Sequence, residues 1–171
     1  WEHLRLRYEP FPIGIARPVM EPALYGELVD AFPEPGRFVT LDKVGDKFTL
    51  SERFGAREYR AFVRDHPLWR EFHAWVKSRA FIAAVLDALR TRHVDLGFDI
   101  TSSPARRLRK RLADALRGGV RTDALELRSR FEFSMLPARG GHVIPHTDGA
   151  SKVVTLVVSM LREGDWNPTW G

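Results

Sequence analysis

The sequence contains no cysteine and no long apolar run. Without cysteine there are no disulfides, no thiolate zinc sites and no cysteine nucleophile, so any metal would have to be bound by His, Asp or Glu. No apolar stretch approaches the roughly 18 residues that a membrane-spanning helix needs. The first residues, WEHLRLRYEP, include neither an initiator Met nor an apolar signal segment. We therefore expect a soluble, cytoplasmic protein that does not interact with membranes.

The chain does contain enough apolar material to build one core. Of its 171 residues, 44% are hydrophobic, 29% are charged and 11% are aromatic, which is typical of a single globular domain rather than a disordered chain. The net charge is +5, and the positive charge is concentrated between Pro104 and Arg121, where seven Lys and Arg accompany one Asp. The high pI of about 10.0 therefore describes one segment rather than the whole protein.

The Arg-rich segment 104–121 is predicted to be a helix that begins after Ser103 and ends at Gly118 and Gly119. Its simplest interpretation is a solvated helix face. The functional alternative is recognition of an anionic substrate, or a nucleic-acid or phosphate-binding module. Nucleic acid is the less favoured partner, because the aromatic residues are spaced for a helical core rather than for a stacking platform. The cations of this alternative are Arg106, Arg107, Arg109, Lys110 and Arg111.

Residues 1–125 are predicted to be a mainly helical N-terminal part with one small hairpin. A helical spacing of apolar residues runs from 23 to 32, and residues 38–50 alternate as in a hairpin that turns near 44–46. From about 58 to 90 the period is again helical, and Pro67 can open a helix at its first turn. His73 is expected to be an interface side chain rather than a ligand. The aromatic residues expected in the core are Trp69, Phe72, Trp75 and Phe81.

Residues 126–171 are predicted to be strands belonging to the same structural domain. Phe131, Phe133 and Met135 alternate with polar residues, as in a half-buried strand, and 142–148 form a short second strand. Residues 152–161, KVVTLVVSML, are typical of a strand covered on both faces. The fold class is therefore α+β. A sheet built from so few strands would have unpaired edges. We therefore expect the sequence to be a fragment of a longer chain.

Two His-x-Asp triplets are the candidate metal ligands. Residues two apart on a strand point to the same side, so His146 and Asp148, at the end of a predicted strand, can both reach one metal ion. His93 and Asp95 instead follow a predicted helix end, where a solvated turn is the simpler interpretation. The pattern alone is common by chance, so the surrounding residues decide between the two triplets.

The residues around His146 make a resemblance visible. The run RFEFSMLPARGGHVIPHTDGASKVVTLVVSML is similar to the first half of the double-stranded β-helix (jelly roll) of the iron(II)- and 2-oxoglutarate-dependent dioxygenases. The resemblance covers about Leu127 to Gly171. It implies N-terminal helices packed on the first strands of an incomplete jelly roll, truncated within 126–171. It also implies that His146 and Asp148 bind Fe(II) in a hydroxylase-type oxygenase that uses 2-oxoglutarate and dioxygen.

The sequence departs from this family after Asp148. No His follows His146, and the only later Arg is Arg162 in a predicted turn, so the distal ligand and the Arg that binds 2-oxoglutarate lie outside this sequence. The fragment itself is therefore expected to be inactive. Ser134 and Thr155 are candidates to contact the co-substrate.

Three further points stay open at the level of the sequence. His142 is an alternative ligand, although its position beside two glycines favours an exposed loop. Lys152 and Thr155 are three residues apart on a predicted strand, so at most one of them is expected to line the pocket. A cupin-like metal-binding domain without oxidase activity remains an alternative function. Neither the substrate nor the oligomeric state follows from the sequence.

Overall fold

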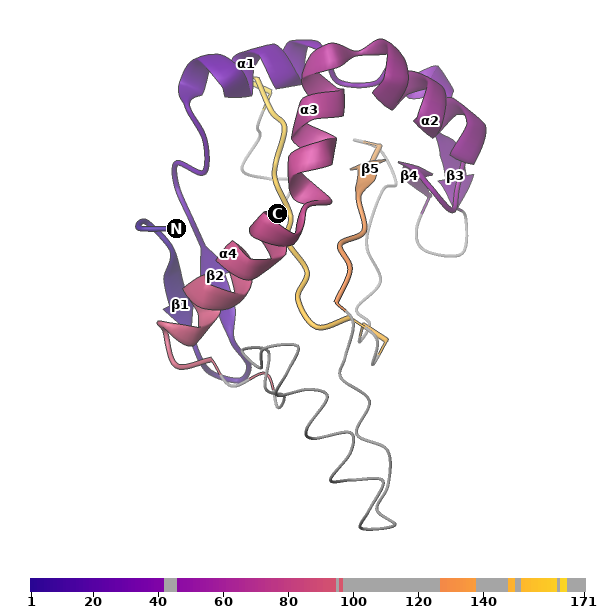
Figure 1. The fold of residues 1–171 in the computed structure, drawn as a ribbon. Helices are drawn as coiled ribbons and strands as arrows, with labels where there is room; N and C mark the ends of the chain where they lie inside the picture. Colours follow the sequence, from indigo (N-terminus) through magenta and orange to yellow (C-terminus); the bar gives the residue numbers. More distant parts are fainter. Residues whose placement is uncertain are drawn as a thin grey trace.

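The computed structural model describes residues 1–41, 46–94, 96, 127–137, 148–149, 152–162 and 164–165. These residues form four α-helices and two small antiparallel sheets (Figure 1). The α+β class is thereby confirmed, while the jelly roll stays a prediction. The Arg-rich segment 104–121 and the predicted strand before Asp148 lie outside the described residues, as does the turn at 42–45.

The four helices are α1 (Pro22–Asp30), α2 (Ala56–Asp65), α3 (Pro67–Val76) and α4 (Arg79–Arg90). The region predicted to be helical from about 58 to 90 therefore holds three helices, and Pro67 opens one of them as expected. Ser78 is the N-cap residue of α4, and its hydroxyl accepts a hydrogen bond from the Phe81 backbone N–H at 3.1 Å. Among the helices that the structure describes, none is both long enough and apolar enough to cross a membrane.

The larger sheet joins two distant parts of the chain. Its strands are β3 (Val39–Leu41), β4 (Lys47–Ser51) and β5 (Glu132–Met135), in the order β3-β4-β5, and both pairs are antiparallel. A single 3-10 turn, η1 (Pro35–Arg37), precedes β3. The predicted hairpin and the predicted alternation around Phe133 are confirmed, since Phe133 is 3% exposed and its neighbours on β5 are exposed.

The smaller sheet was not expected from the sequence. It pairs β1 (Arg5–Arg7) with β2 (Ile13–Ile15), and the hairpin lies beside α4, far from the larger sheet (Figure 1). Arg92 holds it there, because its guanidinium donates to the backbone carbonyl oxygens of Trp1 at 2.5 Å and Leu4 at 3.2 Å.

The core lies between the helices and the larger sheet. Seven buried side chains form it, and they come from α1, α2, α3, β4 and β5. Trp69 is 1% exposed, as predicted, but the prediction that Trp75 is a core residue is wrong, because Trp75 is 52% exposed. Trp75 lies on the outer side of α3, and its ring contacts Phe72 and Phe81 rather than the sheet. The buried set is Leu28, Leu50, Tyr59, Phe62, Val63, Trp69 and Phe133.

Residues 152–162 are extended but belong to neither sheet. The prediction of a strand covered on both faces is wrong for the described part of the chain, since Val157 is 85% exposed and Leu156 is 47% exposed. No sheet layer lies over these side chains in the part that the structure describes. Met160 alone packs against the core. Figure 1 shows the segment, in yellow, rising past α3 to reach α1.

Candidate functional site

Asp148 is the described member of the predicted metal pair, and it accepts hydrogen bonds at both carboxylate oxygens. Thr155 donates its hydroxyl to Oδ2 at 2.9 Å, and the Lys152 ammonium forms an ion pair with Oδ1. Both side chains reach Asp148, although at most one was expected to line the pocket. The difference arises because 152–155 is not part of a regular strand, so the alternation of faces does not hold.

Lys152 and Thr155 lie at the start of the extended segment 152–162, whose other end is fixed to α1. The Tyr25 hydroxyl on α1 accepts from the Leu161 backbone N–H at 2.9 Å and lies 2.8 Å from the Leu161 carbonyl oxygen. Tyr25 and Met160 thus hold the far end of the segment, while the Asp148 side chain stays 35% exposed. Solvent and small solutes have access to this carboxylate.

The other predicted site residues are not assembled around Asp148 within the described residues. His146 and the alternative ligand His142 lie outside them. Ser134 is on β5, on the exposed face opposite Phe133, and pairs in register with Thr49. Among the described residues, no group of three or more His, Cys, Asp or Glu side chains is arranged to hold a metal ion.

The second His-x-Asp triplet is interrupted by a turn. His93 is exposed and has a positive φ of 57°, and it follows the end of α4. A left-handed residue at a helix end is a turn geometry, in agreement with the expected solvated turn. Its partner Asp95 lies outside the described residues.

The hydrogen bond from Thr155 to Asp148 suits a metal-binding carboxylate. Asp148 only accepts hydrogen bonds in these contacts, and an acceptor-only carboxylate is the form that binds a metal. Carboxylate ligands in proteins are commonly held in place by a further hydrogen bond. Thr155 supplies such a bond. The Lys152 ammonium occupies Oδ1, so it would have to move away before a metal cation could bind that oxygen, because like charges repel. Carboxylate is itself a ligand that Fe(II) accepts, together with imidazole.

A separate group of titratable residues lies between α2 and α3, and no sequence pattern pointed to it. Tyr59 is 2% exposed, and its ring centroid lies 5.8 Å from that of His73. Burial raises the pKa of Tyr59, and the charge of Glu52 adds to the increase. Burial lowers the pKa of His73, Lys77 lowers it further, and Glu52 opposes the change. Both groups are therefore neutral near pH 7.

No protein-family model, no curated protein and no solved structure matches this chain.

Proposed function

We propose that this chain is part of an iron(II)- and 2-oxoglutarate-dependent oxygenase of the hydroxylase type, in which His146 and Asp148 bind the iron. The observation that supports the proposal is the arrangement at Asp148. Its carboxylate is accessible, and it is oriented by Thr155 and Lys152 from the extended segment that follows it. The type of activity is inferred from the resemblance of residues 127–171 to the first half of a jelly roll.

The residues of this chain have distinct parts in the proposed mechanism. Asp148 and His146 would hold the metal, and Thr155 would fix the orientation of the carboxylate through Oδ2. Bound iron, with 2-oxoglutarate and dioxygen, supplies the oxidising power for hydroxylation of a substrate C–H bond. Lys152 would release Asp148 Oδ1 when the metal binds, and Ser134 is a candidate contact of the co-substrate. Tyr25 holds the segment that carries Lys152 and Thr155 against α1.

The proposal requires residues that this sequence does not contain. A second histidine ligand and a basic residue for the far carboxylate of 2-oxoglutarate are implied by the resemblance, and no histidine follows His146. We therefore assign the activity to a longer chain that includes this sequence. The cupin-like alternative differs, because it needs further histidines immediately around His146.

The experiment measures succinate formed from 2-oxoglutarate by the complete natural chain that carries this sequence, under reducing, aerobic conditions with and without Fe(II). Succinate is expected only with Fe(II). An Asp148→Asn variant, which keeps the shape but weakens the ligand, is expected to lose about 100-fold or more in activity, since even the loss of a ligand's hydrogen-bond partner costs about 10- to 100-fold in metal affinity.

The matched control is Asp165→Asn, an equally conservative change at an exposed carboxylate of the same region, which accepts from the Arg162 backbone N–H at 3.1 Å. Its activity is expected to match that of the unmodified protein. Absence of iron-dependent succinate, or an Asp148→Asn variant as active as the control, would reject the proposal.

A further inference from the structure

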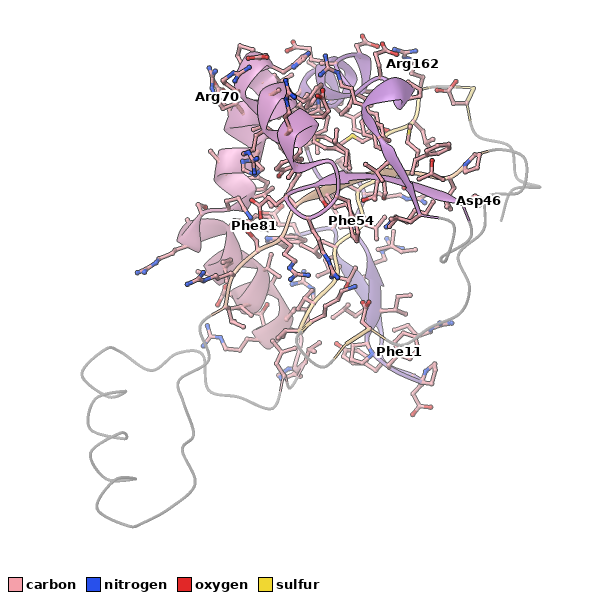
Figure 2. The ribbon with its side chains drawn as sticks, turned by 90° about the vertical axis from the view of Figure 1, so that its right-hand side faces the viewer. Phe11, Asp46, Phe54, Arg70, Phe81 and Arg162 are labelled. Carbon is pink, nitrogen blue, oxygen red and sulfur yellow. The ribbon has the colours of Figure 1, made fainter. Side chains whose placement is uncertain are left out.

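A groove of about 500 Å³ lies between α2 and α3, away from Asp148. Three arginines line its exposed rim, Arg60 and Arg64 from α2 and Arg70 from α3. Figure 2 shows Arg70 at the outer edge of the molecule. A space of this volume is within the range of small-molecule sites.

The helical period explains why these residues meet. On α2, residues 59, 60, 63 and 64 lie on one side of the helix, and on α3 residues 70 and 73 do the same, because three and four residues make about one turn. The two sides face each other across the short break at His66. Arg70 joins the helices directly, since its Nη1 donates to the Arg64 carbonyl oxygen at 2.9 Å.

The positive charge at the rim is only partly neutralised. Arg64 is held by Asp65, with nitrogen-to-oxygen distances of 2.6 and 2.9 Å. Arg60 makes no hydrogen bond or ion pair within the described part of the chain. The acidic residue of the groove, Glu52, is already paired with Lys77 at 2.9 Å. Arg60 and the outer part of Arg70 therefore offer guanidinium donors whose planar geometry matches phosphate and carboxylate.

The floor of the groove also contains polar atoms without partners. It is formed by the buried Tyr59 and Val63 with His73 beside them. The Tyr59 hydroxyl and His73 Nε2 are buried, and neither has a hydrogen-bond partner among the residues that the structure describes. Buried polar atoms without partners are rare in native proteins because each one is destabilising, so they often mark a missing water or ligand.

We infer that this groove is a binding site for a small organic anion that has an aromatic or aliphatic body and a terminal phosphate or carboxylate. The anionic group lies on Arg60 and Arg70, and the body covers Val63 and the Tyr59 ring. This site is independent of the proposed oxygenase activity, because none of its residues contacts Asp148, Lys152 or Thr155 in the described part of the chain.

The experiment titrates the complete natural chain that carries this sequence with phenyl phosphate, benzoate and phenol, and follows binding by isothermal calorimetry and by backbone amide shifts of α2 and α3. Phenyl phosphate or benzoate is expected to bind saturably, and the stronger of the two identifies the anionic group. Phenol, which has the ring but no charge, is expected to bind at least about tenfold more weakly, since hydrogen bonds to charged groups are the strong ones.

Arg60→Gln is the test variant and Arg57→Gln is its matched control. Both arginines are exposed on α2, one turn apart, but Arg57 does not line the groove. Arg60→Gln is expected to weaken binding of the anionic probe about tenfold, and Arg57→Gln by less than about twofold. Equal weakening by the two variants would indicate a general attraction to a basic helix face and would overturn the inference, as would the absence of saturable binding.

A Tyr59→Phe variant tests the floor. The change removes an unpaired buried hydroxyl, so the fold is expected to be retained. Binding of the anionic probe is expected to stay within about twofold, because the ligand body covers the ring, which phenylalanine keeps, and not the buried hydroxyl. A larger loss of affinity would contradict the placement of the apolar body over the Tyr59 ring.

Discussion

Trp69 connects three parts of the molecule that are far apart in the sequence. Its indole N–H donates to the Ala31 carbonyl oxygen at 2.8 Å, immediately after α1, and its ring centroid lies 4.8 Å from that of Phe133 on β5. The side chain itself belongs to α3 and is 1% exposed. At the residue scale, the packing of helices on the sheet therefore depends strongly on this one indole.

Replacement of Trp69 by alanine is expected to lower the free energy of unfolding by about 3–5 kcal/mol, because it leaves a cavity and an unpaired carbonyl oxygen. Trp75→Ala is the control, since Trp75 lies on the same helix but is 52% exposed, and it is expected to cost less than about half as much. Urea denaturation followed by circular dichroism measures both. Equal losses would contradict the assignment of Trp69 to the core.

His73 makes the stability depend on pH. Burial lowers its pKa below the usual 6.5, with a further decrease from Lys77. The folded protein therefore keeps the imidazole neutral at a pH at which the unfolded chain protonates it. Because the unfolded state then binds more protons, the contribution of His73 is complete above about pH 6.5 and declines as the pH falls below that value.

The test compares urea midpoints at about pH 7.5 and about pH 5.5. The variant His73→Phe keeps an aromatic ring against Tyr59 and Phe131, whose centroids lie 5.8 and 5.5 Å away. It is expected to lose less stability on acidification than the unmodified protein. His3→Gln, at an exposed position near the N-terminus, controls for the loss of one imidazole. Identical pH dependence in the His73 variant would refute this explanation.

At the scale of the element, the ends of the helices are set by particular residues. Ser78 caps α4 through its hydroxyl, which accepts from the Phe81 N–H, whereas α1 and α3 begin at proline. Gly55, before α2, has a positive φ of 69°, a conformation that favours glycine.

Ser78→Ala is expected to destabilise the protein by about 1 kcal/mol, because one N–H of the first turn of α4 loses its partner. Ser78→Asp keeps an acceptor at the cap and is expected to retain the original stability or exceed it. Thermal unfolding of the two variants measures the difference. A loss of equal size in Ser78→Asp would show that the cap hydrogen bond is not the cause.

Local sequence signals predicted helix starts and strand alternation correctly. Features that depend on tertiary packing were predicted wrongly or not at all. Pro67 and the alternation around Phe133 are local signals, and both were confirmed. The exposure of Trp75 depends on which side of α3 meets the sheet, and the helical period alone does not determine that side. For the candidate site, the three-residue spacing of Lys152 and Thr155 on a predicted strand implied that at most one would line the pocket, whereas the irregular backbone lets both contact Asp148. The groove between α2 and α3 required knowledge of how the two helices pack.

At the scale of the whole molecule, the chain folds back so that its last described segment meets its first helix. Tyr25 on α1 contacts the backbone of Ser159 and Leu161, more than a hundred residues later, and Arg162 forms an ion pair with Asp30 at 3.2 Å. In Figure 2, Arg162 and Phe11 of the N-terminal hairpin lie at opposite ends of the molecule. Because Tyr25 and Asp30 both belong to α1, the segment 152–162 depends on α1 for its position.

Tyr25→Phe is expected to increase the hydrogen-exchange rate of the Leu161 amide about threefold to tenfold, because that amide loses its hydroxyl acceptor. Tyr8→Phe is the control. Tyr8 donates to the Arg92 carbonyl oxygen at 2.6 Å at the other end of the molecule, and its replacement is expected to leave Leu161 unchanged. Exchange by mass spectrometry measures both. An unaltered rate in Tyr25→Phe would mean that the segment is held by Met160 and its neighbours instead.

The nine residues VVTLVVSML, from 153 to 161, contain no charge and no proline, and Val157 is 85% exposed. Extended, β-branched segments of this kind can template intermolecular pairing and lead to aggregation. Solutions of the 171-residue polypeptide are therefore expected to scatter more light as their concentration and storage time increase. A single gatekeeper lysine, Val157→Lys, should delay the onset of turbidity severalfold, whereas Val19→Lys, at another exposed valine, should not.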